Sequence, residues 1–479
     1  MKNLIAIVIA TGLTVLAAGC AAWRTDGDFP TYARSTYQAE MLRSPRTSEH
    51  VSLAEDSDIN TYLAYAAQNN SGLEGAFNRW KAAVERIPQV EALPDPRFNY
   101  RYYISEVETR VGAMRQGFGL SQTFPWLGKL ELSGNVAAEA AKAERYRFEA
   151  TRLKLFYEVE SAYYEYYYLW RSIGILQENI QLVRQMEQVA RTRYTTDASS
   201  HPDVIRAQVE IGKLEDRLRS LQDLRQPVVA KLNAALNQRA GARLPWPTSI
   251  PERDVSFTDE QAIGWLAESS PELKAMDSET AAAEHRVELA RREYFPDVTL
   301  GVDYTDVANS TGGRHPSDDG KDAVAVMASI NLPIWYEKLD AGVREARHRE
   351  WAASLARNQR ANDLASTLKL TLYRFRDAER KVDLYRDTLV PKAIEAVKAS
   401  ESAFGAGTVS FTDLIDAQRV LLEFELAVER ASTDRALYLA ELEMLVGRSV
   451  PTGATTTHDT ALSPRPGEEK EISDENNGD

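Results

Sequence analysis

The sequence predicts a mainly α-helical protein with a smaller β part suited to a membrane, built from one structural unit written twice. Three observations support this fold class. Similar residues recur in the same order roughly 200 positions apart. Within each copy, the hydrophobic period changes from a helical pattern to strict alternation and back again. The helical pattern that follows each alternating segment is also too long for a compact domain.

The repeat is visible as matching residues separated by a nearly constant number of positions. This separation is 200 residues near the start of each copy, 209 after the alternating segments and 210 near the end. Most of the increase falls at 309–316, whose Asn, Ser, Gly and Pro residues are typical of a loop. The first copy covers 59–244, a linker covers 245–258 and the second copy covers 259–448. Matched pairs include Leu73 with Leu273, Trp126 with Trp335, Lys129 with Lys338, and Asp203 with Asp413.

Each copy is expected to begin with a helix and to continue with a β-hairpin. The helices are predicted from 59 to about 92 and from 259 to about 293, because these segments are rich in Ala, Glu, Lys and Leu. The hairpins are predicted at about 97–125 and about 297–333, where apolar and polar residues alternate.

Both predicted hairpins have an apolar face. The residues of this face are Phe98, Tyr100, Tyr102 and Ile104 in the first copy, and Val298, Leu300, Val302 and Tyr304 in the second. Each strand has about 9 to 11 residues, the length that a tilted strand needs to cross a bilayer within a barrel. One such hairpin could equally pack at the edge of a soluble core. Two equivalent hairpins, each flanked by helices, favour membrane strands.

A long helix is predicted after each hairpin, at about 128–194 and about 337–404. At about 1.5 Å per residue, each of these helices would be on the order of 100 Å long. A short break rich in Gly, Ser and Thr then leads to a second helix, at about 203–238 and about 413–447. The helix before the hairpin and the helix after the break together equal the long helix in length. Each copy can therefore form two parallel helical tracks.

The predicted strands require more than one chain. Four strands are too few to close a barrel, and lipid does not tolerate the open edges of a sheet. Strands from two, three or four chains must therefore combine, and the strand count alone does not choose between these numbers.

The N-terminus has the layout of a secretory signal peptide, which we predict over 1–19. Lys2 precedes an apolar run that is too short to span a bilayer, and small residues lead to Cys20. Cys20 is the single cysteine of the sequence, so it has no partner for an internal disulfide. We expect it to carry a covalent lipid, with 20–58 as a lipidated extension; a buried apolar cysteine is the plainer alternative. Ala21 favours sorting to the outer membrane, by analogy with bacterial lipoproteins.

Composition and motifs exclude several classes of function. The formal net charge of −14 argues against nucleic-acid binding, which depends on Lys and Arg. After the signal peptide there is no apolar run of about 20 residues, so a helical membrane protein is excluded. The sequence lacks HExxH, P-loop and GxGxxG motifs, so we expect no enzyme, no metal site and no cofactor besides the lipid. The polar, acidic segment 449–479 is predicted to be disordered.

The duplicated order of elements, with the segment Val409-Ser410-Phe411-Thr412-Asp413-Leu414-Ile415-Asp416-Ala417-Gln418, resembles the TolC family of outer-membrane efflux proteins. The resemblance covers about 59–448. It implies a homotrimer with a twelve-stranded barrel in the outer membrane of a Gram-negative bacterium and a twelve-helix tunnel through the periplasm. It also implies two partners, a periplasmic adaptor (membrane fusion protein) and an inner-membrane pump, expected to be of the RND type. The segment from Phe124 to Leu130 is similar to the branch that serves heavy-metal and cation efflux.

The resemblance also implies a gate at the periplasmic tip of the second repeat, where carboxylates surround the narrowest point. The matching positions are Asp413 and Asp416. Helix capping explains Asp413 equally well, because Ser410-x-x-Asp413 is a capping box. The first copy repeats this pattern at Asp203, after Ser200.

Asp416 has no such alternative, since its counterpart in the first copy is Arg206, and it is the better gate candidate. The family's closing latch uses a Tyr and an Arg, whereas Phe404 and Val409 stand at those places, opposite the retained acid Asp203. A looser or apolar closure is therefore expected. Tip turns and adaptor docking are expected at Ser200, Gly405, Gly407, Thr408 and Ser410.

One rival from another class remains open. A periplasmic coiled-coil scaffold lipoprotein without a pore would explain the long helices and the lipid. It has no need for strands with a lipid-compatible face, so the hairpins favour the channel.

Overall fold

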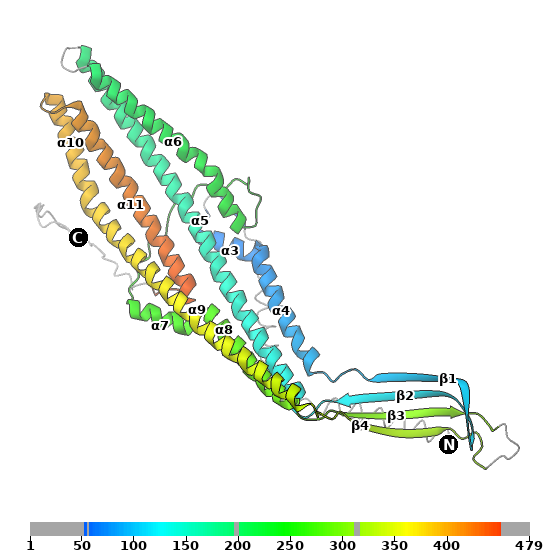
Figure 1. Ribbon diagram of the computed structural model, residues 1–479. Coiled ribbons are helices and arrows are strands. Elements are labelled where there is room, and N and C mark those ends of the chain that lie inside the picture. Colours follow the sequence, from blue (N-terminus) through cyan, green and yellow to red (C-terminus); the bar gives the residue numbers. More distant parts are fainter. Residues whose placement is uncertain (1–51, 55–56, 196–200, 311–316, 452–479) are drawn as a thin grey trace, which may run out of the picture.

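The computed structural model describes residues 52–54, 57–195, 201–310 and 317–451. It is a long helical rod with a four-stranded sheet extending from one end (Figure 1). The predicted signal peptide, Cys20, Ser200 and nearly all of the acidic tail lie outside the described residues. Among the described helices, none combines the length and the apolar character that crossing a membrane would require.

The two repeats contain the same elements in the same order. The first consists of α3 (Ile59–Asn69), α4 (Ser71–Glu91), β1 (Arg97–Thr109), β2 (Gly112–Phe124), α5 (Lys129–Thr195) and α6 (His201–Ala235). The second consists of α7 (Asp259–Ser269), α8 (Pro271–Arg292), β3 (Val298–Val307), β4 (Ala323–Ile330), α9 (Tyr336–Leu384), the π-helical turn η2 (Tyr385–Leu389), α10 (Val390–Ala406) and α11 (Phe411–Val446).

The structure corrects the expectation of one helix before each hairpin, because both segments are broken in two. In the first copy, the side chain of Asn70 accepts a hydrogen bond from the backbone N–H of Leu73 at 3.0 Å and so caps α4. In the second copy, Pro271 occupies the first position of α8, where its missing N–H costs nothing. The composition of both segments favoured helix throughout, but these capping residues restart it.

The sheet has the order β1-β2-β3-β4, and all its neighbours are antiparallel. The register places Tyr100 opposite Phe118, and Phe118 opposite Tyr304, so aromatic side chains line up across three strands. The predicted apolar face is exposed in the single chain; Ile104 is 94% accessible to solvent and Val326 is 81% accessible. Strands β1 and β4 form the two edges of the sheet. Exposed apolar residues and unpaired edges both require surroundings other than water.

The junction of sheet and rod contains a buried charge. Lys129 is 6% exposed, and its ammonium lies 2.9 Å from Oδ1 of Asp297. The same oxygen accepts a hydrogen bond from the backbone N–H of Trp126 at 2.9 Å, and the Trp126 ring stacks on Phe295. Because a buried charge is stable only when it is paired, this contact locks the start of α5 to the second repeat. Trp335, the repeat counterpart of Trp126, is 72% exposed.

Hydrophobic clusters follow the rod from the junction to the tips. One joins α4 to α5, one joins α3, α5 and α6, one joins α7, α9 and α11, and the last joins α5, α6, α10 and α11 near the tips. The tyrosine-rich part of α5 belongs to the second of these. Tyr163 meets Tyr62 edge-to-face at 5.3 Å, and Tyr166 stacks on Trp246 at 4.7 Å. These aromatic side chains pack helices together and attach the linker.

A half-buried acid lies at the middle of the rod. Burial and the nearby negative charge of Glu443 raise the pKa of Glu160 to about 7, while Arg253 acts in the opposite direction. The unfolded carboxyl ionises around its ordinary value of 4.5. The contribution of Glu160 to the stability of the fold is therefore fully present below pH 4.5 and is lost as the pH rises toward 7.

Replacement of Glu160 with Gln should remove the free-energy cost of ionising this carboxyl in the folded protein. At pH 8 the variant is expected to be more stable than the wild type by about 1 to 3 kcal/mol, and at pH 4.5 the difference should vanish. Thermal melting of the detergent-solubilised protein at both pH values measures this. Glu158→Gln, at an exposed position on the same helix, is the matched control and should change little at either pH. Equal stabilisation at both pH values would contradict the assignment.

Candidate functional site at the helical tips

The two helical hairpins of the rod end side by side, far from the sheet (Figure 1). In the second repeat, α10 ends at Gly407, whose φ of 78° is a left-handed conformation that glycine adopts without strain. The N–H of Thr408 donates to the carbonyl of Ala403 at 2.9 Å and closes the turn. Ser410 then begins α11. The turn of the first repeat, with Ser200, falls among the residues that are not described.

Asp413 forms the capping box that the sequence suggested. Its backbone N–H donates to the hydroxyl of Ser410 at 3.2 Å, and its carboxylate accepts from the backbone N–H of Ser410 at 3.0 Å. Hydrogen bonds from the Ser410 hydroxyl and backbone lower the pKa of Asp413. This carboxylate therefore stays ionised and caps α11.

Asp416 is paired with an arginine three residues further along the same helix, a contact that was not predicted from the sequence. Its carboxylate lies 2.9 Å from Arg419, which also binds Glu210 of α6 at 3.0 Å. Glu210 is 6% exposed, whereas the side chain of Asp416 is 57% exposed. Arg419 thus links the two repeats near the tip, with Asp416 on the outer side of this bridge.

In the first repeat, Asp203 and Arg206 form contacts within α6 and with α11 near the tip. They are paired within α6 at 3.3 Å, and Arg206 also donates to the hydroxyl of Thr412 at 3.0 Å. A groove of about 300 Å³ runs between the first turns of α6 and α11, with Asp416 and Ile205 among its lining residues. The three acids predicted for the gate therefore lie at one end of the molecule but form separate contacts.

A further contact between the tips was not predicted. Arg193, in the last turn of α5, donates to the carbonyl oxygens of Phe404 and Gly405, the latter at 3.2 Å. Its guanidinium also lies over the ring of Phe404, 4.7 Å from the centroid. Phe404 is 5% exposed and packs on Phe411 at 5.5 Å. Phe404 is therefore packed within its own chain, against Phe411 and an arginine from α5.

The sequence contained a signal for this contact. A basic residue near the end of one long helix suits the carbonyl groups at the end of the next, because helix C-termini carry partial negative charge. The repeat placed the ends of α5 and α10 together. The looser or apolar closure of the gate stays a prediction; within one chain, the structure shows cation–π and hydrogen-bonding contacts at the tip.

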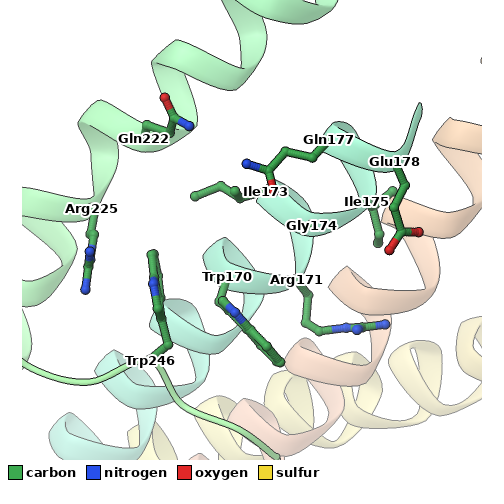
Figure 2. A pocket seen from close by; sticks show the side chains of 10 residues that line it. All are labelled: Trp170, Arg171, Ile173, Gly174, Ile175, Gln177, Glu178, Gln222, Arg225 and Trp246. Carbon is green, nitrogen blue, oxygen red and sulfur yellow. The ribbon is translucent and has the colours of Figure 1, made fainter. Parts of the chain in front are cut away.

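Neither metal ligation nor catalysis is indicated by the described residues. No group of three or more His, Cys, Asp or Glu side chains in the described ranges could hold a metal ion. His201 is the exposed first residue of α6, next to the ring of Tyr194. A hollow of about 580 Å³ lies between α5, α6 and the linker (Figure 2). Its ten lining residues include no Ser, Cys or His, and its Arg225 lies over the ring of Trp246 at 4.1 Å.

Arg193→Ala should loosen the tip of the second repeat. The lost contacts are worth about 1 to 2 kcal/mol, so backbone amides of residues 404–410 should exchange hydrogen about tenfold faster. Hydrogen exchange with mass spectrometry measures this. Arg191→Ala is the control, since Arg191 is paired with Glu187 of its own helix at 2.6 Å. If both variants exchange at the same rate, Arg193 does not hold the tip.

Comparison with known proteins agrees with this architecture. The outer membrane efflux protein family matches residues 63–238 and 262–448, one segment in each repeat. The cobalt-zinc-cadmium resistance protein CzcC of Cupriavidus metallidurans is 25% identical over 388 residues, which are 76% of this chain and 84% of that protein.

Solved structures share the fold at low sequence identity. The outer membrane protein VceC of Vibrio cholerae has a TM-score of 0.67 at 19% identity, over 82% of this chain and 96% of that one. CusC, a transmembrane channel, has a TM-score of 0.70 at 16% identity, over 82% and 93%. Since the family match covers both repeats, this chain belongs to the outer membrane efflux protein family, whose members are outer-membrane channels and not enzymes.

Proposed function

We propose that three copies of this chain assemble into the exit duct of a tripartite efflux pump, with a closable gate at the helical tips. As an outer-membrane efflux channel, the chain works together with an adaptor and an inner-membrane pump. The observation that carries the proposed assembly is the four-stranded sheet, which has an apolar face and two unpaired edges at the end of a helical rod. Three such sheets make a closed barrel of twelve strands.

The repeat supports a ring in which each contact between chains resembles a contact within a chain. Strand β2 pairs with β3 across the repeat boundary, so β4 is expected to pair with β1 of the next copy. Likewise α11 packs on α5, and by the same relation α6 would pack on α9 and α10 of the next copy.

The gate is proposed at Asp416, with Asp413 and Asp203 contributing negative charge. Under threefold symmetry, the exposed carboxylate of Asp416 would occur three times around the axis. Such a ring attracts cations and can be blocked by multivalent ones. Arg419 holds each carboxylate in a fixed position.

The groove between α6 and α11 supports adaptor docking at the tips, together with the turn residues. It combines apolar side chains such as Val209 with charged ones such as Lys213, a mixture typical of protein interfaces. The docking residues would be Ser200, Gly405, Gly407, Thr408 and Ser410. The inner-membrane pump is proposed to be of the RND type. Divalent metal cations are the first cargo to test, given the relative named for cobalt, zinc and cadmium resistance.

Cys20 is proposed to anchor the chain to the outer membrane through a covalent lipid. Its support is its place as the single cysteine, directly after an apolar N-terminal segment and small residues. Cells expressing the wild type should incorporate labelled palmitate into this protein, whereas Cys20→Ser should incorporate none. Label that persists in the variant would remove this role. Because the barrel holds the protein in the membrane independently, both proteins should still fractionate with the outer membrane.

The assembly is tested with protein extracted from membranes in mild detergent. On an unheated gel, the protein should migrate as a trimer, and boiling should convert it to a monomer. In a planar bilayer, the trimer should show low conductance that falls further when multivalent cations are added on the tip side. A soluble monomer would contradict the duct. A pore-free scaffold lipoprotein would give such a monomer after release of its lipid anchor.

The variant Asp416→Asn tests the gate within the same experiment. Removing the charge should weaken the block by multivalent cations about tenfold or more, with trimer formation unchanged. Glu423→Gln, farther along α11, is the control and should preserve the block. Unchanged block in Asp416→Asn would remove Asp416 from the gate while leaving the duct intact.

A further inference from the structure

The two long helical tracks differ at one place. In the first repeat, α5 is an uninterrupted α-helix from Lys129 to Thr195. In the second, the corresponding helix contains the π-helical turn Tyr385–Leu389 between α9 and α10. At the end of this turn, the N–H of Val390 donates to the carbonyl of Tyr385, five residues earlier rather than four.

The repeat identifies this turn as the site of a one-residue insertion. Before it, buried positions of the two helices correspond at a separation of 209 residues, as in Leu155 and Leu364 or Tyr166 and Phe375. After it the separation is 210, as in Val183 and Ala393, both of which are buried. A π-turn accommodates one extra residue while the helix on either side keeps its face toward the core.

Pro391 explains why the insertion is located here. Proline lacks an N–H and its ring collides with the carbonyl four residues earlier, which would be that of Asp387. The wider π-turn before it relieves this collision. The first repeat has Gln181 at the equivalent position, and its helix continues without a break.

The π-turn also separates two hydrophobic clusters. The cluster of α7, α9 and α11 uses α9 as far as Phe375, and Val382 is the last buried residue before the turn. The tip cluster begins on the other side, with Val390 and Ala393. Residues 385–389 include no buried side chain. The tip half and the sheet-side half of this helix are therefore packed into different cores.

The sheet-side half is also tied down at the turn. Arg386 lies 3.1 Å from Glu252 of the linker and 3.3 Å from the hydroxyl of Ser432 in α11. The ring of Tyr385 reaches toward the tip side, where it meets Phe424 at 5.6 Å. Motion of the tip therefore begins beyond Arg386.

We propose that the π-turn is the hinge on which the tip of the second repeat swings against a rigid first repeat. Two packed helices can bend together only if one lengthens relative to the other. A π-turn allows this change in length, because its extra residue lets the backbone alternate between i→i+5 and i→i+4 hydrogen bonds. This inference rests on the proposed gate, and it assigns the moving part to α10 and the first turns of α11.

The hinge is tested by removing the extra residue. Deletion of Thr388 combined with Pro391→Ala should give an uninterrupted helix with the register of the first repeat, so both clusters remain packed. Pro391→Ala alone is the matched control, since it keeps the extra residue and hence the hinge. All proteins are studied as the full chain, purified from membranes.

The first measurement does not depend on transport. By hydrogen exchange, amides of residues 385–390 in the wild type should exchange about tenfold faster than those of residues 175–180, and the deletion variant should lose this difference. Equal exchange of the two segments in the wild type would overturn the hinge. So would failure of the deletion variant to assemble, because the extra residue would then be needed for packing.

The second measurement is opening in a planar bilayer. The deletion variant should open about tenfold less often than the wild type, whereas Pro391→Ala should open as the wild type does. A deletion variant that opens normally would overturn the hinge. If the wild type carries no current, the proposed duct fails, and the exchange comparison still decides whether the π-turn is mobile.

Discussion

The backbone at the edges of the sheet imposes the constraint on which the rest of the structure depends. Strands β1 and β4 each have one side without a partner strand in the single chain, and their apolar face is exposed. In lipid, every backbone N–H and C=O must be paired within protein, so such a sheet exists only as part of a closed barrel. In the proposed assembly, closure by three chains would place their helical rods in a ring. The length of the rod would then set how far the duct reaches from the membrane.

Because the sequence is duplicated, contacts between neighbouring chains of the proposed ring would resemble contacts within one chain. The places where the two repeats differ indicate function. At the junction of sheet and rod, Lys129 and Asp297 join the two repeats within one chain, whereas Trp335 is exposed. At the tips, Arg193 of the first repeat binds the end of α10 in the second. The π-turn occurs in the second repeat alone among the described residues. A rigid first repeat and a hinged second one are thus combined in each chain.

Charge at the tips is organised by pairs that cross between helices. Glu210 of α6 is buried and its pKa is lowered chiefly by hydrogen bonding to Arg419 of α11. That arginine in turn holds Asp416 at the surface. Glu210 is therefore ionised in a fixed position, and movement of α11 against α6 would have to break a partly buried ion pair.

The sequence by itself determined the order of elements, because period and repeat depend only on local spacing. The alternating residues from Phe98 to Ile104 form a strand with that apolar face, and the capping box of Asp413 involves neighbours three residues apart. Tertiary structure decided the rest. The ion pair of Arg419 with Glu210 and the contact of Arg193 with Phe404 join residues more than 200 positions apart, and no local pattern encodes such distances. The sequence contained the change in separation from 209 to 210, but only the folded helix shows that the extra residue became a π-turn between two cores.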